Sequence, residues 1–389
     1  MTSTDRPVLV AGGGIGGLAA ALALARAGRR VRVLEQAPAF GEIGAGIQLA
    51  PNALRVLDTL GVLDHVMEHA VFPARAVMID ALTGKEITRV DLGPGFVQRY
   101  GYRYLVVHRQ DLLEALLQGC RAQASIELAT GRTVQSFVQE GSGVEVRCAD
   151  GTTELGSALI GADGLRSPVR AQLLDDGAPR FSGHLCYRGV VPMDRIPDRE
   201  YGDAMALWVG PNMHLVQYPL RQGKLMNNVV VIVSQQYLRG DANYGGWDEV
   251  ESLFAPALPR VRDMLGYIER DRNWPLHDRD PAPNWSHDRV TLLGDAAHPT
   301  LQNMAQGACM AIEDALCLAE RLANTDDYQD AFRAYQQDRY LRTARVQISA
   351  RFMAQLVHVG GGARDVRNDV LSRRSPEGFP ELDWLYRGP

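Results

Sequence analysis

The sequence has 389 residues, of which 46% are apolar and 22% charged, with a formal net charge of −5. This is ordinary for a globular protein, and the length suffices for two domains, or one elaborated domain, enclosing a cofactor. Charge is spread without a basic run, so nucleic acid is not an expected partner, because phosphate binding needs clustered lysine and arginine. Five cysteines without a Cys-x-x-Cys pair predict reduced thiols in a cytoplasmic protein. The apolar run 18–25 is too short to cross a bilayer, so no membrane span is expected.

The chain opens on a predicted βαβ unit: a strand over 7–11, a glycine turn, an apolar helix to residue 28 and a strand over 30–34. Gly12, Gly14 and Gly17 fit the G-x-G-x-x-G pattern at the required place, between strand and helix. The turn brings backbone close to a pyrophosphate, and the helix N-terminus offers N–H groups to it. Glu35 ends the second strand, where a carboxylate accepts hydrogen bonds from ribose hydroxyls. These residues predict a dinucleotide site and leave both FAD and NAD open.

Beyond this unit, segments typical of a nucleotide-binding layer alternate with a β-rich insert. The pattern predicts a helix over 51–60, strands within 74–99, a helix over 107–117, hairpin strands within 133–149, a buried strand from 158, strands within 183–233, a strand over 289–295, a helix over 307–322 and a charged helical C-terminal region. We expect an FAD-binding domain built from residues 1–73, 100–180 and 270–340, a substrate domain from 74–99 and 181–269, and a C-terminal helical extension over 341–389.

Three motifs resemble those of the class A (single-component) FAD-dependent aromatic monooxygenases, the family of the 4-hydroxybenzoate and salicylate hydroxylases. They are the glycine turn, the segment 161–167 (Gly-Ala-Asp-Gly-Leu-Arg-Ser) and the segment 294–299 (Gly-Asp-Ala-Ala-His-Pro). The resemblance implies that Asp163 lies near FAD and the nicotinamide donor, that Asp295 holds the ribityl chain and that Arg109 approaches the pyrophosphate or ribose. The residues themselves leave other readings: a turn aspartate, a helix N-cap and a surface ion pair, respectively.

The same resemblance implies an α/β fold. It has a discontinuous Rossmann-type FAD domain of the glutathione-reductase kind, an antiparallel-sheet substrate domain and a C-terminal helical extension, as in 4-hydroxybenzoate hydroxylase. The helix that opens at Gly307 and Ala308 would direct its positive end at the flavin. NADH or NADPH would be the co-substrate, with neither favoured because there is no second Rossmann turn. A homodimer is compatible with the family likeness.

Within the family the likeness is strongest to the 3-hydroxybenzoate 6-hydroxylases, which make gentisate. It is carried by segments 44–48, 210–220 and 299–302 and by Trp285. It implies that His214, Tyr218 and Gln302 line the substrate pocket, and we assign Gln48 to the cofactor site. Because His214 and Tyr218 are four residues apart in a predicted strand, their side chains share one face. Each of the three residues could instead have a structural role, as a satisfied histidine, a core aromatic or a loop glutamine.

The expected reaction is hydroxylation of a small phenolic acid para to its hydroxyl, dependent on NAD(P)H and O2, through a flavin C4a-hydroperoxide. Neutral His214 would accept the phenol proton, in a pocket that excludes water. Salicylate and 6-hydroxynicotinate remain alternative substrates, although 6-hydroxynicotinate enzymes tend to carry histidine near the positions of Gln48 and Gln302. A non-oxygenating flavin reductase and a flavin-binding regulator are alternatives of other classes.

One pattern points elsewhere. His65-Val-Met-Glu-His69 reads H-x-x-E-H, a pattern found in metallopeptidases. Its charged neighbours are typical of a solvated helical face, and no metal is expected.

Overall fold

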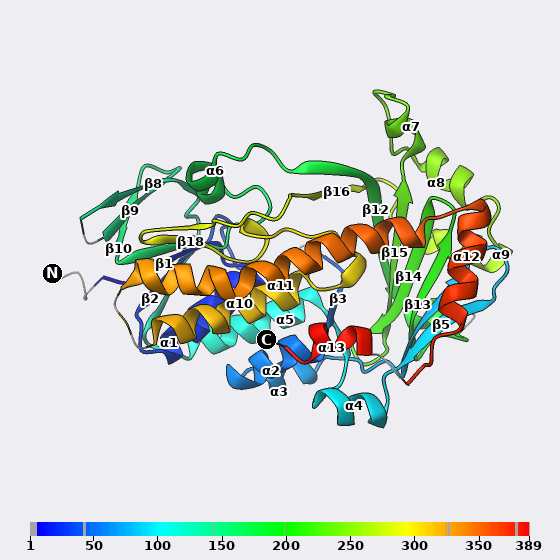
Figure 1. Cartoon of the computed structure of the whole chain (residues 1–389), viewed down its shortest axis with the longest axis horizontal. Helices are drawn as coiled ribbons and strands as arrows, with labels where there is room; N and C mark the ends of the chain where they lie inside the picture. Colours follow the sequence, from blue (N-terminus) through cyan, green and yellow to red (C-terminus); the bar gives the residue numbers. More distant parts are fainter. Residues whose placement is uncertain are drawn as a thin grey trace.

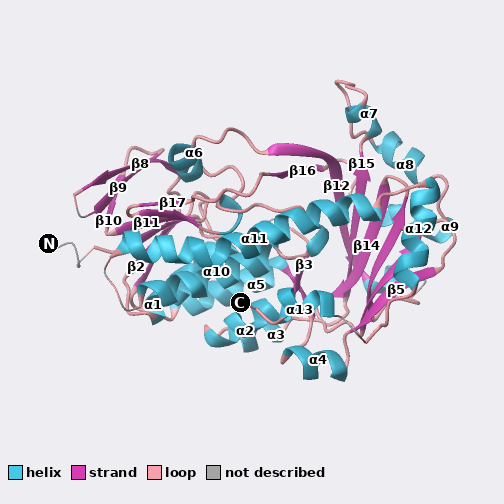
Figure 2. Ribbon diagram, in the orientation of Figure 1, coloured by secondary structure: helices cyan, strands magenta, loops and turns pink. Residues whose placement is uncertain are grey.

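The computed structural model describes residues 6–41, 44–141, 143–197, 199–323, 325, 327–377 and 380–388. Glu42 and Ile43, in the glycine-dense loop before residue 48, lie outside the described residues. Two sheet-based parts lie side by side, and the long helix α11 (Tyr328–Val357) runs along both of them (Figures 1 and 2).

A six-stranded sheet organises the first part, with the order β17-β18-β11-β1-β2-β7. Its strands run in parallel except for the edge strand β17, which is antiparallel to β18. Their bounds are β1 (Val8–Ala11), β2 (Val31–Leu34), β7 (Ile126–Ala129), β11 (Ala158–Gly161), β17 (Ser286–His287) and β18 (Val290–Leu292). Because parallel strands end at one edge of a sheet, the loops after β1, β2, β11 and β18 converge there.

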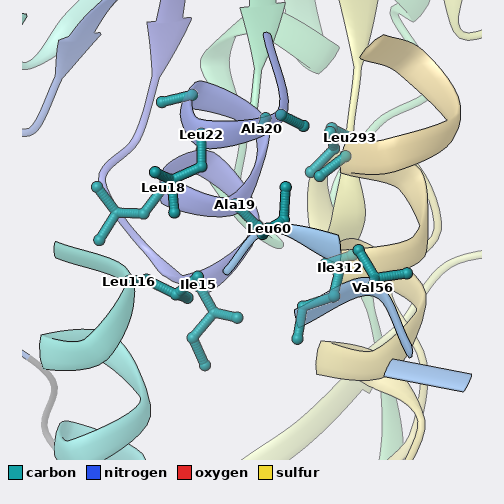
Figure 3. Close-up of a cluster of buried hydrophobic side chains, with 14 of the residues drawn as sticks. Ile15, Leu18, Ala19, Ala20, Leu22, Val56, Leu60, Leu116, Leu293 and Ile312 are labelled. Carbon is teal, nitrogen blue, oxygen red and sulfur yellow. The ribbon is translucent and has the colours of Figure 1, made fainter. Parts of the chain in front are cut away.

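Helix α1 (Ile15–Arg26) crosses from β1 to β2 and is buried on nearly all sides. It packs between α5 (Arg109–Arg121) and α10 (Gly307–Leu322), with α2 (Pro51–Thr59) beside α10. Figure 3 shows part of this core, to which α1 contributes Leu18 and Leu22, α5 contributes Leu116 and α10 contributes Ile312. The apolar composition of α1 is therefore that of a core helix, and its alanines let neighbouring helices approach closely.

Smaller elements surround this sheet. They are the strands β8 (Val134–Glu140), β9 (Gly143–Cys148) and β10 (Thr153–Gly156) of a three-stranded sheet, the pair β3 (Gly46–Leu49) and β6 (Leu105–His108), and the helices α3 (Leu63–Met67), α4 (Pro94–Tyr100) and α6 (Pro168–Leu174).

Two local predictions need correction here. Residues 94–100, expected within a strand-forming stretch, form helix α4, because Pro94 suits a first helical turn and Gly101 closes the helix at φ 82°. The helix expected from residue 107 begins at Arg109, because 105–108 pair with β3 as strand β6.

A seven-stranded sheet organises the second part, with the order β16-β12-β15-β14-β13-β4-β5. Its neighbours are antiparallel except for the parallel pair β13 and β4. The bounds are β4 (Arg75–Asp80), β5 (Glu86–Asp91), β12 (Arg180–Pro192), β13 (Ala204–Gly210), β14 (Met213–Leu220), β15 (Leu225–Val233) and β16 (Trp274–Asp278). Residues 274–278, which the sequence places in the FAD-binding part, pair with β12 instead.

The two faces of this sheet have different partners. Leu215 of β14 and Ile232 of β15 pack in one hydrophobic cluster with Phe254 and Val261 of the outer helices. These helices are α8 (Trp247–Phe254) and α9 (Pro259–Asp263), with short turns α7 (Gln235–Leu238), η2 (Met193–Arg195) and η3 (Met264–Tyr267) nearby. The opposite face turns toward the first part of the molecule, so alternate residues of β14 are available to a site between the two parts.

The C-terminal helices connect the two parts. Helix α11 crosses the boundary expected at residue 341 without a break, so the extension begins earlier than predicted. Its last residue, Val357, packs against Met78 and Val209 of the large sheet. Two shorter helices follow, α12 (Gly361–Ser372) and α13 (Pro380–Tyr386). Among the helices of the described ranges, none is long and apolar enough to cross a membrane.

Candidate active site

One cavity of about 740 Å³ runs from the glycine turn after β1 to the inner face of the large sheet. Its volume lies in the range typical of sites for cofactors and small ligands. Cofactor-site residues predicted from the sequence line one end: Gly12, Gly14, Glu35, Arg109, Asp163, Asp295, Gly307 and Ala308. Gln48, also predicted for the cofactor site, lies beside Tyr218 instead and accepts a hydrogen bond from the hydroxyl of Tyr104 at 2.9 Å. The three predicted catalytic residues, His214, Tyr218 and Gln302, line the other end. The fold thus brings together residues from distant parts of the chain.

The glycine turn is shaped by close backbone contacts. Gly12 has φ 103°, and a Cβ there would lie 2.4 Å from the carbonyl oxygen of Ala162. A Cβ on Gly17, which does not line the cavity, would lie 1.9 Å from the carbonyl oxygen of Gly12. Glu35 closes the turn by accepting hydrogen bonds from the N–H groups of Gly13 at 2.7 Å and Ala37 at 2.8 Å. The first turn of α1 is therefore open to a phosphate, with a carboxylate at its side.

Asp163 lies directly against this turn. Its Oδ2 accepts a hydrogen bond from the N–H of Val169 at 3.2 Å, and its backbone Cα lies 3.1 Å from where a Cβ on Gly12 would be. Burial raises the pKa of its carboxyl group. Asp163 therefore has the structural role of a turn aspartate and also lines the cavity.

Asp295 follows β18 in the 3-10 turn η4 (Gly294–Ala296). Its side chain is open to the cavity and enclosed by protein elsewhere, and this removal from bulk water raises its pKa, while Arg109 and His298 act in the opposite direction. A Cβ on Gly307 would lie 3.9 Å from its Oδ1, so Asp295 stands beside the N-terminus of α10. A carboxylate at this place can accept hydrogen bonds from a polyol.

A buried ion network that sequence reasoning missed holds this turn in place. Asp314 of α10 accepts from the N–H of Gly294 at 3.0 Å and from Nε2 of His298 at 2.6 Å. Arg339 of α11 bridges Asp314 at 2.7 Å and Glu313 at 2.6 Å. His298 and Arg339 hold the pKa of Asp314 down at about 2, against the effect of burial. The adjacent acids at 313 and 314 were visible in the sequence, but no local pattern points to residue 339 as their partner.

These features fit FAD. The turn and the start of α1 offer N–H donors for a pyrophosphate, Glu35 and Asp295 offer acceptors for hydroxyls, and Arg109 offers a cation. The N-terminus of α10 places positive potential at the point where the cofactor end of the cavity meets the substrate end.

Gly17→Ala is expected to weaken FAD binding by about 5–150-fold, because relieving the clash with the turn costs roughly 1–3 kcal/mol. Titration of the apoprotein with FAD, followed by flavin fluorescence, gives the dissociation constant. Gly95→Ala is the matched control, since a Cβ on this α4 residue meets nothing within 4 Å. Equal affinities of the two variants would show that the close contact between turn and helix is not needed.

At the substrate end, His214, Val216 and Tyr218 of β14 all line the cavity. Tyr218 is 4% exposed and its ring lies against Gly46, where a Cβ would come within 2.3 Å of Cε2. Burial raises the pKa of Tyr218, so its hydroxyl remains a hydrogen-bond donor. Gln302, in the turn η5 (Gln302–Met304), contacts the Cys186 Sγ at 3.9 Å.

His214 is 3% exposed, and its Nδ1 lies 2.8 Å from Nε2 of His358, at the end of α11. Burial lowers the pKa of His214 to about 3, with a smaller effect from His184. The imidazole is therefore neutral near pH 7 and can act as a hydrogen-bond acceptor.

Arg188, a candidate partner for a substrate carboxylate that the sequence alone does not assign, is also a residue of this site. It lies on β12, lines the cavity, and has no acidic ion-pair partner among the described residues. The other arginines at this end differ, since Arg89 pairs with Glu86 and Arg374 with Glu381.

The H-x-x-E-H pattern lies away from the cavity. Helix α3 ends at Met67, and both histidines are exposed. Within the described residues, no group of three or more histidine, cysteine or acidic side chains is placed to hold a metal ion.

Comparisons with known proteins agree with this site. A family model of the FAD binding domain matches residues 5–348. A 3-hydroxybenzoate 6-hydroxylase of Polaromonas naphthalenivorans (strain CJ2) is 46% identical over 384 residues, which are 98% of this chain and 96% of that protein. A 6-hydroxynicotinate 3-monooxygenase of Bordetella bronchiseptica is 35% identical over 349 residues, 87% of this chain and 89% of that protein. The crystal structure of Klebsiella pneumoniae HpxO complexed with FAD and uric acid matches with a TM-score of 0.83 at 26% identity, over 96% of this chain and 95% of that chain.

These likenesses confirm the resemblance inferred from the three motifs, the predicted fold class and FAD as the cofactor. The chain belongs to the FAD-dependent monooxygenase family that includes the 3-hydroxybenzoate 6-hydroxylases.

Proposed function

We propose that this enzyme hydroxylates 3-hydroxybenzoate para to its hydroxyl group and releases gentisate. The reaction consumes NADH or NADPH and O2, placing one oxygen atom on the ring and releasing the other as water. FAD, when bound, supplies the redox chemistry. The residues of this chain hold the ring, accept the phenol hydrogen and exclude water.

The proposal rests on the arrangement of side chains on one face of the large sheet. Arg188 stands opposite Val229, and Val229 opposite Val216, so these three side chains form a row across β12, β15 and β14. His214 lies on the same face, two residues from Val216 along β14. Strand spacing and residue rise place the backbones of Arg188 and His214 roughly 12 Å apart. Both side chains line the cavity together with Val216 and Val229, and these two valines form an apolar floor for an aromatic ring.

This arrangement suits a ring with a carboxylate and a phenol at separate positions. The Arg188 guanidinium can form a charge-assisted hydrogen bond with the substrate carboxylate. No acidic side chain of the described residues has to be displaced from Arg188 first. Neutral His214 can accept the phenol hydrogen, which makes the ring more electron-rich. Tyr218 donates, and Gln302 can donate or accept, so the two can hold the ring in one orientation.

The alternatives are other substrates of the same enzyme class, salicylate and 6-hydroxynicotinate, and a flavin reductase that does not use oxygen. The relative from Bordetella bronchiseptica is named a 6-hydroxynicotinate 3-monooxygenase, so 6-hydroxynicotinate stays among the alternative substrates. Glutamines at positions 48 and 302 favour the hydroxybenzoate, because 6-hydroxynicotinate enzymes tend to carry histidine near both places.

The test is NADH and NADPH oxidation together with O2 uptake, measured with 3-hydroxybenzoate, salicylate, 4-hydroxybenzoate and 6-hydroxynicotinate, and with the products identified. We expect 3-hydroxybenzoate to stimulate both rates and to yield gentisate. Greater coupled turnover of another acid would overturn the substrate, and NADH oxidation without O2 uptake would overturn the monooxygenase reaction for this chain. The proposal includes a cytoplasmic location and a homodimer, which cell fractionation and light scattering after size exclusion test.

Arg188→Gln is expected to raise the KM for 3-hydroxybenzoate about 10–100-fold, because hydrogen bonds to charged groups contribute roughly 1.5–3 kcal/mol. The KM for the neutral 3-hydroxybenzamide should change little. Arg272→Gln is a matched control, since the Arg272 and Arg188 guanidinium groups lie over the same Trp274 ring, at 4.9 and 5.5 Å, and Arg272 is exposed. An equal effect on acid and amide would show that Arg188 does not bind the carboxylate.

A further inference from the structure

Two buried histidines from different parts of the fold meet at the substrate end of the cavity. His214 belongs to β14, and His358 caps the C-terminus of α11. Their ring planes are nearly parallel, 23° apart, and the ring centroids lie 4.8 Å from each other. The backbone is also linked there, because the N–H of Asn212, in the turn before β14, donates to the carbonyl oxygen of His358 at 2.9 Å. The position of His358 relative to β14 is therefore set by main chain as well as side chain.

The direction of the hydrogen bonds made by this pair follows from which atoms can donate and which can only accept. His358 Nδ1 lies 2.7 Å from the carbonyl oxygen of Ala354. A carbonyl oxygen only accepts, so Nδ1 of His358 carries a hydrogen. In neutral His358 the other nitrogen, Nε2, then has a free lone pair. It lies 2.8 Å from Nδ1 of His214, which must therefore donate.

The protonation of His214 follows. A neutral imidazole that carries its hydrogen on Nδ1 has a bare Nε2. Since Nδ1 is turned to His358 and the ring lines the cavity, Nε2 is the nitrogen left for a substrate. We propose that His358 is a positioning residue that fixes the tautomer of His214, so that the nitrogen available in the cavity is always a hydrogen-bond acceptor.

The surroundings keep the pair neutral. The ring of His184, on β12, lies 5.1 Å from that of His358, and Arg367 of α12 donates to the carbonyl oxygen of Val357 at 3.1 Å. Burial lowers the pKa of His358, and the neighbouring His214, His184 and Arg367 lower it further. Asp80 lies behind Arg367, at 3.9 Å. Because no acidic side chain among the described residues contacts either ring, nothing there favours a permanently charged imidazole.

The catalytic consequence rests on the proposed function. When Nε2 of His214 takes the phenol hydrogen as a proton, the ring becomes an imidazolium whose Nδ1–H still donates to His358. The positive charge is then held by a hydrogen bond that already exists, and no group has to reorient. In the other tautomer, Nε2–H would meet the phenol as a donor and could not accept its hydrogen.

Two substitutions separate this role from simple packing. His358→Gln keeps an acceptor for the His214 Nδ1–H, whereas His358→Leu keeps bulk and removes the acceptor. With the phenolic acid that the wild type turns over best, we expect kcat to fall about 10–100-fold in the leucine variant with little change in KM, and to recover to within a few-fold in the glutamine variant. His277→Gln, at a half-buried histidine on β16 that does not line the cavity, is the control.

The tautomer is measured directly by NMR of holoenzyme labelled with 15N in the histidine rings, with His214 assigned from its absence in His214→Phe. The expected result is protonated Nδ1 and bare Nε2 for His214 in the wild type and the glutamine variant. Protonated Nε2 in the wild type, or equal kcat in the two variants, would overturn the proposal. The wild-type spectrum decides even if the leucine variant does not fold. If no acid of the substrate panel is hydroxylated, the proposed function fails while the spectrum still tests the tautomer.

Discussion

Replacing His214 by phenylalanine is expected to lower the rate of coupled hydroxylation by about 10²–10⁴-fold, the usual contribution of a positioned acid or base. Phenylalanine fits a strand and keeps the ring volume, but it cannot accept a hydrogen bond. A free phenol has a pKa of about 10, so near pH 7 the substrate would stay protonated and its ring less reactive. NADH oxidation should persist in part, with the missing product appearing as H2O2.

The same residue predicts a pH dependence. Since burial lowers the pKa of His214 to about 3, the wild-type base stays deprotonated when the pH falls from 7 to 5. We therefore expect no loss of kcat/KM with an inflection near 6.5, the ordinary pKa of histidine. Initial rates of gentisate formation and NADH consumption, measured at varied 3-hydroxybenzoate concentration between pH 5 and 8, give both results. His277→Phe is the control, and full coupled turnover by His214→Phe would exclude His214 as the base.

Replacing Arg339 by leucine is expected to lower the free energy of unfolding by about 3–5 kcal/mol, because it leaves two buried carboxylates without their shared cation. Arg339 is 1% exposed at its side chain, and Glu313 and Asp314 are as deeply buried. Since Asp314 also accepts from the N–H of Gly294, the turn that carries Asp295 should shift, and FAD affinity should fall as well.

Urea denaturation of the apoprotein, with and without added FAD, measures both effects. Arg333→Leu is the matched control on the same helix, where an exposed pair with Asp330 at 3.3 Å should contribute less than about 1 kcal/mol. Adding Asp314→Asn to Arg339→Leu should recover part of the loss, because Asp314 loses its arginine partner whereas Glu313 keeps Arg342 at 2.6 Å. A stability of Arg339→Leu equal to that of the control would contradict a structural role for the network.

The cofactor end of the cavity was predictable because its signals are local. Gly12, Glu35, Asp163 and Asp295 each follow a buried strand, at the end of β1, β2, β11 and β18. Parallel strands of one sheet deliver such residues to one edge, so motif and strand together predict a shared site. In the same way, the period-two spacing of His214 and Tyr218 predicted that both side chains lie on one face of a strand.

Element boundaries were less predictable. Residues 274–278 belong to the large sheet, although the sequence places them in the FAD-binding part. Helix α11 continues through residue 341, where the sequence predicts a boundary. No glycine or proline marks a stop near 341, and an edge strand is recognised only when its partner is known. In both cases tertiary packing, which no local pattern reports, decided the limits.

The sequence by itself thus determined the dinucleotide turn, the two aspartates at the cofactor end of the cavity and the strand face that carries His214. Only the tertiary structure decided what surrounds that face. It set Arg188 across two strands from His214, tied Arg339 to the acids of α10, and placed His358 against His214 across 144 residues of chain. The reason is physical: the direction of a hydrogen bond, and whether a buried charge is paired, depend on partners that only the folded chain brings into contact.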